Sequence, residues 1–291
     1  MSLSAAGILL EILKAIFLGI VEGVTEWLPI SSTGHMIIVD TFIKLNVSDE
    51  FKNLFLVCIQ LGAIMAVVII YWKRIWPFSA VKKNGSDSNS NGITILASKK
   101  ILVMWLKVLA ACIPAAIIGI LFDDLFEKYF YNYICVAAVL ILFGILMIIV
   151  EKNNVKPSVK NISAITYKDA VIIGLWQVIA AIFPGTSRSG ATIVGSLLLG
   201  ISRCTAAEFT FFLAIPVMFG ASLLKIVKFI SAGFSATGFE LMLLAVGMIT
   251  AFAVSIFIIR FLMNFIKNHS FIAFGIYRII LGAVILLLAF I

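Results

Sequence analysis

Two short polar stretches in an otherwise apolar chain carry the residue types that could perform chemistry. Residues 22–35 combine carboxylates, hydroxyls and an imidazole, and residues 183–192 combine hydroxyls with a guanidinium. Both stretches also contain the helix breakers proline and glycine. Charged and polar groups inside apolar segments are costly and usually functional. We therefore expect the two stretches to build one site.

The spacing of Glu22 and Glu26 predicts two carboxylates on one helical face. Two such carboxylates repel each other in an apolar setting, so that one takes up a proton or a cation binds between them. Oxygen ligands of this kind suit Mg²⁺ or Ca²⁺, especially when a substrate phosphate adds further oxygens. Glu22 and Glu26 are therefore our candidate metal ligands. The alternative is a carboxylate that is hydrogen-bonded to a helix N-terminus or to loop hydroxyls.

The first stretch also predicts an anion site at a helix break. Pro29 is expected to end one helix, and Ser31 or Ser32 is expected to cap the helix that follows. The free N–H groups and the positive dipole end of that second helix would then lie at the break.

The second stretch repeats this arrangement and adds a cation. Pro184 and Gly185 interrupt the chain, and Thr186 or Ser187 is expected to cap the next helix. Arg188 supplies a planar guanidinium that suits bidentate contacts with phosphate. Phosphate is therefore the predicted ligand. Ser189 and Thr192 follow as hydroxyl donors, and Gly190 allows close approach of the backbone.

His35 follows Ser32 by three residues, so a continuing helix would place the imidazole over the same face as the hydroxyl. Such a pair can act as nucleophile and base, or the histidine can act as an acid toward a leaving oxygen. We take Ser32 as the candidate nucleophile and His35 as base and then acid. Attack by His35 itself or by a metal-activated water stays open. The ordinary alternative is a hydrogen-bonded packing histidine.

Composition identifies the class of protein that must position these residues. Of the 291 residues, 63% are hydrophobic and only 12% are charged, which is typical of a polytopic membrane protein and excludes a soluble globular domain. About 20 apolar residues span the hydrocarbon core. Six runs qualify as transmembrane helices, at residues 54–72, 101–122, 133–150, 209–227, 241–260 and 271–291.

Two further apolar segments, residues 8–39 and 170–200, contain the polar stretches near their middle. Irregular backbone at membrane depth is tolerated only where protein buries it or where it lines a wet cavity. We therefore predict two re-entrant helix hairpins. A pair of kinked spanning helices is the alternative.

Basic residues in the loops predict the orientation of the chain. Within residues 73–100, lysines and an arginine flank the polar stretch 84–92, and further lysines occur in residues 151–168, so the positive-inside rule makes both segments cytoplasmic loops. The turn at residues 123–128 is then expected outside. On this topology the first hairpin enters from the outer face and the second hairpin from the cytoplasmic face.

The two halves of the chain, residues 1–150 and 169–291, share landmarks. Matched landmarks with opposite membrane polarity indicate an inverted-topology repeat, in which the broken helices of both halves meet at the site. We predict a single all-α polytopic membrane domain over residues 1–291, with about six transmembrane helices and two re-entrant hairpins in such a repeat. An offset of 155 residues pairs Gly19 with Gly174, Glu22 with Gln177, Pro29 with Pro184 and Ser32 with Ser187.

Other polar residues carry weaker signals. The net charge of +8 is explained by the cytoplasmic loops and indicates no nucleic-acid partner. Gln60, Gln177 and Glu208 could support ligands or form interhelical hydrogen bonds. The cysteines show no metal-binding spacing and are expected to pack in the core. Basic residues expected to extend to the membrane interface are Lys107, Lys225, Arg260 and Arg278.

The two polar stretches resemble the motifs of a known family. The run EGVTEWLPISSTGH at residues 22–35 and the run PGTSRSGAT at residues 184–192 are similar to the two motifs of bacterial undecaprenyl-diphosphate phosphatases, the bacitracin-resistance family. The similarity continues through residues 55–74 and the pair Tyr277-Arg278. It is weakest in residues 81–98.

This resemblance implies an enzyme that removes the terminal phosphate of undecaprenyl diphosphate. The products would be inorganic phosphate and undecaprenyl phosphate, the lipid carrier for peptidoglycan and cell-wall glycan synthesis. It also implies bacitracin resistance, a divalent cation, and a multi-pass protein of the bacterial plasma membrane whose site faces the outer side. The sequence leaves open whether two copies form a homodimer.

The resemblance also assigns residues, because it matches the glutamates, histidine, hydroxyls and arginine of both motifs. Our candidate catalytic residues are Glu22, Glu26, Ser32, His35 and Arg188. Our candidate phosphate-binding residues are Ser31, Thr33, Ser187, Ser189 and Thr192.

A transporter is the competing interpretation, because inverted repeats with broken helices are common in transporters. Such a protein would flip a polyprenyl phosphate, alone or in addition to hydrolysis. A carrier has little use for two acids and an imidazole beside a phosphate, so hydrolysis is favoured.

Overall fold

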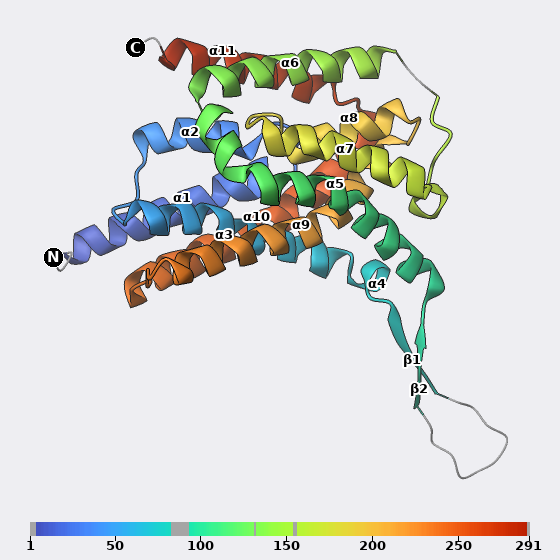
Figure 1. The fold of residues 1–291 in the computed structure, drawn as a ribbon, viewed down its shortest axis with the longest axis horizontal. Coiled ribbons are helices and arrows are strands. Elements are labelled where there is room, and N and C mark those ends of the chain that lie inside the picture. Colours follow the sequence, from blue (N-terminus) through green and yellow to red (C-terminus); the bar gives the residue numbers. More distant parts are fainter. Residues whose placement is uncertain (1–3, 83–92, 131, 154–155, 290–291) are drawn as a thin grey trace.

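The computed structural model describes residues 4–82, 93–130, 132–153 and 156–289 (Figure 1). Apart from one short β-hairpin, the described elements are helices. In chain order they are α1 (Ala5–Thr25), α2 (Ser32–Phe42), α3 (Asp49–Ile70), α4 (Trp72–Ile75), β1 (Phe78–Lys82), β2 (Ile93–Ala97), α5 (Lys99–Phe130), α6 (Tyr133–Lys152), the short 3-10 helix η1 (Ile162–Ala164), α7 (Tyr167–Ile182), α8 (Arg188–Leu198), α9 (Arg203–Ser231), α10 (Gly238–Asn268) and α11 (Ile272–Ala289).

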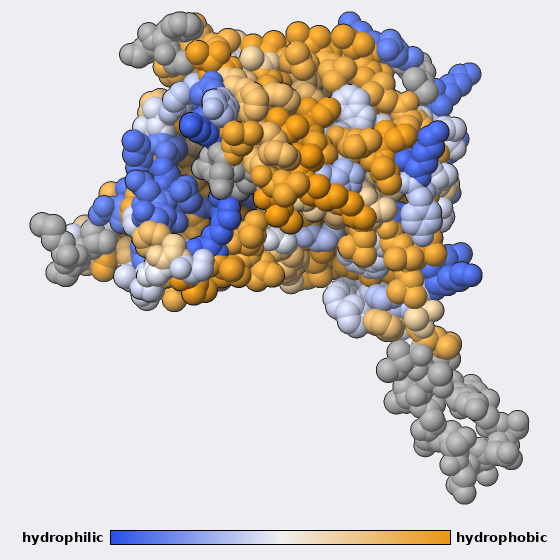
Figure 2. All heavy atoms as spheres, in the orientation of Figure 1, coloured by the Kyte–Doolittle hydropathy of each residue, from blue (hydrophilic) through white to orange (hydrophobic). Residues whose placement is uncertain are grey.

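Five of these helices are long and apolar enough to cross a bilayer: α3, α5 as far as Phe122, α6, α9 and α10. They coincide with five of the six predicted runs, and the sixth run coincides with the shorter apolar helix α11. Figure 2 shows hydrophobic side chains across the middle of the molecule and hydrophilic side chains gathered toward its two ends. The prediction of an all-α polytopic membrane protein is thus confirmed.

The two interrupted segments form the helix hairpins α1–α2 and α7–α8, and proline accounts for both breaks. Pro29 has no N–H to bond the carbonyl of Thr25, and α1 ends at Thr25 rather than at Pro29 as predicted. Phe183 precedes Pro184, is held in an extended conformation and ends α7.

The two hairpins open toward opposite ends of the bundle: α1–α2 toward the chain termini and α7–α8 toward the β-hairpin (Figure 1). The first helix of each hairpin packs on a long helix of the other half, α1 on α10 and α7 on α5. Glycines make both contacts close. A Cβ at Gly19 would lie 2.6 Å from the carbonyl oxygen of Gly247, and a Cβ at Gly174 would collide with the backbone of Ala111. An inverted repeat predicts both features, namely hairpins that open toward opposite ends and equivalent helix contacts between the two halves.

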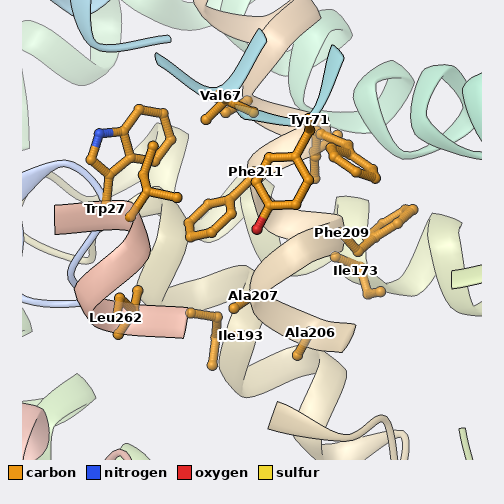
Figure 3. Packing of buried hydrophobic residues seen from close by; sticks show 14 of the residues in the cluster. Trp27, Val67, Tyr71, Ile173, Ile193, Ala206, Ala207, Phe209, Phe211 and Leu262 are labelled. Atoms are coloured by element: carbon orange, nitrogen blue, oxygen red, sulfur yellow. The ribbon is translucent and has the colours of Figure 1, made fainter. Parts of the chain in front are cut away.

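The break of the first hairpin is anchored in the core. Trp27 is fully buried, and its ring meets Phe211 of α9 edge-on with the ring centroids 5.4 Å apart. Figure 3 shows both rings in one cluster with Val67 and Tyr71. Because this apolar packing surrounds the break, the irregular backbone is buried in protein, as membrane depth requires.

Two predicted loops differ from the structure. Residues 123–128, expected as an external turn, belong to the last turns of α5, because this stretch offers good helix formers and neither glycine nor proline. Within the predicted loop 73–100, β1 and β2 pair as an antiparallel hairpin. The middle of that loop, residues 83–92, lies outside the described residues.

The predicted cytoplasmic loops share one end of the bundle. The β-hairpin and the connection from α6 to α7 gather there, and both chain termini lie at the other end (Figure 1). The described parts of loops 73–100 and 151–168 therefore lie on one side, and the positive-inside rule requires this of segments that are rich in basic residues.

Candidate active site

Ser31 and Ser187 mark the two helix breaks in the same way. Each caps the second helix of its hairpin, and its hydroxyl accepts a hydrogen bond from the N–H three residues later, that of Gly34 or Gly190. Their φ angles are 75° and 66°, and no other non-glycine residue of the described chain has a positive φ. Such backbone strain concentrates at functional sites. The predicted pairing of Ser32 with Ser187 is wrong by one residue, because the second stretch has one more residue than the first between its proline and its capping serine.

Arg278 of α11 joins the two breaks. Its fully buried guanidinium donates to the carbonyl oxygens of Pro29 at 3.3 Å, Gly185 at 2.8 Å and Thr186 at 2.7 Å. Gly190 makes room for it, since a Cβ there would lie 2.7 Å from Nη1 of the arginine. The prediction that Arg278 extends to the interface is therefore wrong. The broken helices leave carbonyls without partners at depth, and these require a buried donor.

Glu26 connects the two hairpins through its side chain. Its Oε1 accepts a hydrogen bond from Nη2 of Arg188 at 2.8 Å, and its Oε2 accepts one from Oγ of Ser32 at 2.9 Å. The side chains of Arg188 and Glu26 are only 13% and 9% exposed. Low exposure strengthens such an ion pair relative to one in water. The two polar stretches therefore meet at this contact.

Glu22 lies one helical turn before Glu26 and is 1% exposed. Its Oε1 has no hydrogen-bond partner among the described residues. A buried carboxylate oxygen without a partner is costly, so this atom marks a place for a proton or a cation. The described chain contains no group of three or more His, Cys, Asp or Glu residues that could hold a metal ion. The protein can therefore offer a cation these two carboxylates, with the other oxygens coming from substrate and water.

His35 is held at both of its ring nitrogens. Nδ1 lies 2.7 Å from the carbonyl oxygen of Ser31, and Nε2 lies 2.7 Å from the hydroxyl of Tyr277. The two rings are parallel to within 6°, with centroids 5.6 Å apart. Ser32 instead donates to Glu26. No hydrogen bond joins Ser32 to His35 in the described structure, so the predicted hydroxyl–imidazole pair is not formed.

The remaining predicted phosphate ligands differ in their surroundings. The hydroxyls of Ser187 and Ser189 lie 3.0 Å apart at the first turn of α8. Thr192 is fully buried and its hydroxyl lies 2.8 Å from that of Thr210, so it fastens α8 to α9. Thr33 is half-buried and forms no side-chain hydrogen bond with another described residue.

Polar residues beyond the site have other roles. Lys107 is buried and donates to the carbonyl of Ser163, so the prediction that it extends to the interface is wrong. Glu208 forms an ion pair with Arg74. Gln177 is buried, and neither of its amide atoms has a partner among the described residues.

A cavity of about 240 Å³ lies near the ends of α6, α8 and α10, away from the two breaks. Glu151, Arg203 and Lys267 are among its lining residues, and none of the predicted site residues lines it.

Sequence reasoning missed the roles of Tyr277 and Arg278. The signal was present, because these adjacent polar residues interrupt the last apolar run, where they are costly without a function. Their partners, however, lie in other segments of the chain and leave no local pattern.

Comparison with known proteins identifies the family. The family model described as bacitracin resistance protein BacA matches residues 15–284, nearly the whole chain. The chain belongs to the bacitracin resistance protein BacA family.

Curated relatives of this BacA-family chain are similar over almost their full lengths. The protein of Desulfitobacterium hafniense is 58% identical over 281 residues, which are 96% of each chain. That of Clostridium acetobutylicum is 58% identical over 279 residues, 95% of this chain and 97% of the relative. That of Enterococcus faecalis is 53% identical over 281 residues, 96% of this chain and 97% of the relative. The first and third are named undecaprenyl-diphosphatase, and the second undecaprenyl-diphosphatase 1.

Proposed function

We propose that this protein is an undecaprenyl-diphosphatase, which hydrolyses undecaprenyl diphosphate to undecaprenyl phosphate and inorganic phosphate. The observation that supports this most is the contact between Glu26 and Arg188, because it sets an acid and a guanidinium beside two helix N-termini. The names of the curated relatives point to the same reaction. The reaction returns the lipid carrier to peptidoglycan and cell-wall glycan synthesis and underlies bacitracin resistance, the property for which the family is named.

The breaks provide the binding site for the diphosphate. The first turns of α2 and α8 offer backbone N–H groups and positive dipole ends, and Arg188 can contact two phosphate oxygens at once. The hydroxyls of Thr33, Ser187 and Ser189 are further donors. Positive charge arranged before the substrate arrives is the main source of acceleration in phosphoryl transfer.

Ser32 is the proposed nucleophile. Glu26 is placed to take its proton, because the hydroxyl already donates to this carboxylate at 2.9 Å. Oγ attacks the terminal phosphorus, and the bond to the bridging oxygen breaks as the lipid monophosphate leaves. His35 donates a proton to that leaving oxygen. Water then cleaves the phosphoserine and regenerates Ser32.

Glu22 and Glu26 are the proposed ligands of Mg²⁺ or Ca²⁺. The partnerless Oε1 of Glu22 and the all-oxygen donor set fit such a cation. A bound divalent cation withdraws charge from phosphate oxygens. Glu26 would exchange its contact with Arg188 for the cation and thereby release the guanidinium to the substrate.

We place the site at the outer side of a bacterial plasma membrane. The first hairpin carries the carboxylates and His35, and it opens toward the end of the bundle with the chain termini (Figure 1). The basic loops lie at the opposite end, which the positive-inside rule makes cytoplasmic.

Phosphate release by the purified protein tests the proposal. The protein in detergent is supplied with C55 diphosphate, with and without Mg²⁺, and inorganic phosphate is measured. Detergent offers no bilayer to cross, so phosphate release there reports hydrolysis alone. A flippase without hydrolytic activity would release no phosphate, and that result would refute the proposed function. Single-turnover reactions with labelled terminal phosphate should trap a phosphoserine at Ser32. Turnover without this adduct would favour attack by water.

A further inference from the structure

Tyr277 lies beside Arg278 on α11 and contacts His35. Its hydroxyl lies 2.7 Å from Nε2, and its ring is parallel to the imidazole to within 6°. Arg278 is hydrogen-bonded to both helix breaks. Because Tyr277 is its neighbour in the chain, these bonds also fix the position of Tyr277 relative to α2.

The partners of His35 determine where its protons lie. A backbone carbonyl only accepts hydrogen bonds, so the contact with Ser31 requires a proton on Nδ1. In the neutral ring Nε2 is then an acceptor, and the hydroxyl of Tyr277 donates to it. In the charged ring Nε2 donates and the same hydroxyl accepts. Tyr277 can therefore hold the ring in both charge states without any rotation of the imidazole.

We propose that Tyr277 is a positioning residue that keeps His35 in one orientation and reserves Nε2 as the nitrogen that gains and loses the proton during turnover. This inference rests on the proposed function of His35 as a proton donor. When Nε2 takes up a proton, the hydroxyl of Tyr277 turns from donor to acceptor. During the transfer the leaving oxygen takes the place of the hydroxyl as acceptor of the Nε2 proton, and once the proton has left, the hydroxyl donates to Nε2 again.

This assignment also separates two proton pathways. Ser32 donates its proton to Glu26, and His35 gains and loses its proton at Nε2, the ring nitrogen that faces α11. A packing role alone would not require the phenolic oxygen. Tyr277 is 43% exposed, and a phenylalanine in its place keeps the ring while removing only the hydroxyl.

Nitrogen NMR tests the contact directly, because the chain has only two histidines, His35 and His269. His269 follows the last residue of α10, away from the site, so the variant His269→Gln leaves one imidazole to observe. With ¹⁵N-histidine at pH 8, we expect Nδ1 to be protonated and Nε2 to give the signal of an acceptor in a hydrogen bond. In Tyr277→Phe on this background, the Nε2 signal should move toward that of a free acceptor while Nδ1 stays protonated. A proton on Nε2, or an unchanged spectrum in Tyr277→Phe, would overturn the inference.

Kinetics provide the second measurement. Tyr277→Phe should lower kcat about tenfold and leave KM within about twofold, the pattern of a lost positioning contact. Tyr133→Phe removes the hydroxyl of an exposed tyrosine at the start of α6 and should leave both constants unchanged. Wild-type kcat in Tyr277→Phe would overturn the inference. Failure of the proposed function is distinguishable, because the NMR signals report the contact in resting protein even if no phosphate is released.

Discussion

Arg188 and Glu26 are 162 residues apart in the chain, and their side chains meet at 2.8 Å. Each comes from a different hairpin, and each hairpin is broken by a proline and capped by a serine with positive φ. The hydroxyl of Ser32 lies on the other oxygen of the same carboxylate. The proposed site therefore exists only where the two halves of the protein are joined.

Replacement of Arg188 tests its proposed contact with phosphate. Arg188→Ala should lower kcat/KM by about 10³-fold, because it removes a preorganised positive charge. Arg188→Lys keeps the charge but loses the planar fork, and it should retain part of the activity. Phosphate release is the measurement, and size-exclusion elution identifies misfolded variants. Activity of a folded Arg188→Ala within tenfold of wild type would remove this residue from the mechanism.

The metal proposal predicts that EDTA abolishes phosphate release and that Mg²⁺ or Ca²⁺ restores it. Glu22→Gln should raise the Mg²⁺ concentration needed for half-maximal rate by about tenfold or more, since it removes one of two charged ligands. Direct titration of the variant with Mn²⁺, followed by electron paramagnetic resonance, should show weaker binding. Rates that are indifferent to EDTA would instead indicate a proton shared between Glu22 and Glu26.

Arg278 should contribute strongly to stability. Arg278→Met leaves three buried carbonyls without their donor, which we expect to cost about 3 kcal/mol. The thermal midpoint in detergent should therefore fall, and activity should fall with it because the two breaks are no longer joined. Arg260→Met, at an exposed position of α10, is the matched control and should leave the midpoint unchanged. Equal midpoints for the two variants would contradict the role of Arg278 as a clamp.

Gly190 should be intolerant of a side chain. In Gly190→Ala the new Cβ would lie 2.7 Å from Nη1 of Arg278, so the guanidinium or α8 has to shift. We expect a lower thermal midpoint and at least about a tenfold loss of phosphate release, because the first turn of α8 moves. In Gly119→Ala on α5 the added Cβ meets nothing within 4 Å. That variant should be as stable as wild type or more stable, by up to about 1 kcal/mol.

The sequence predicted the parts of this protein that depend on local pattern. Apolar runs marked the spanning helices, and proline with serine marked the two breaks at Pro29 and Pro184. The four-residue spacing of Glu22 and Glu26 followed from helical periodicity. The predicted pairing of the caps was one residue out, because the second stretch has one more residue than the first between its proline and its capping serine.

The contacts made by α11 could not be predicted in this way. Tyr277 reaches a histidine 242 residues away, and Arg278 bonds to carbonyls in both breaks. A buried arginine and one that extends to the interface have the same local sequence pattern, and only the packing of α11 on α6 decides between them. Residues 123–128 were predicted as a turn because charged residues are common in loops. The same residues are also compatible with a helix, and they form the end of α5.

Arg278 follows both hairpins in the chain, and this order has a consequence for biosynthesis. The ribosome completes the first hairpin before the second, and the residue that binds both is made after them. A partly made protein thus has both breaks without the guanidinium that joins them. Lipid diphosphates that it meets during insertion should remain intact until Arg278 has been made and has joined the two breaks.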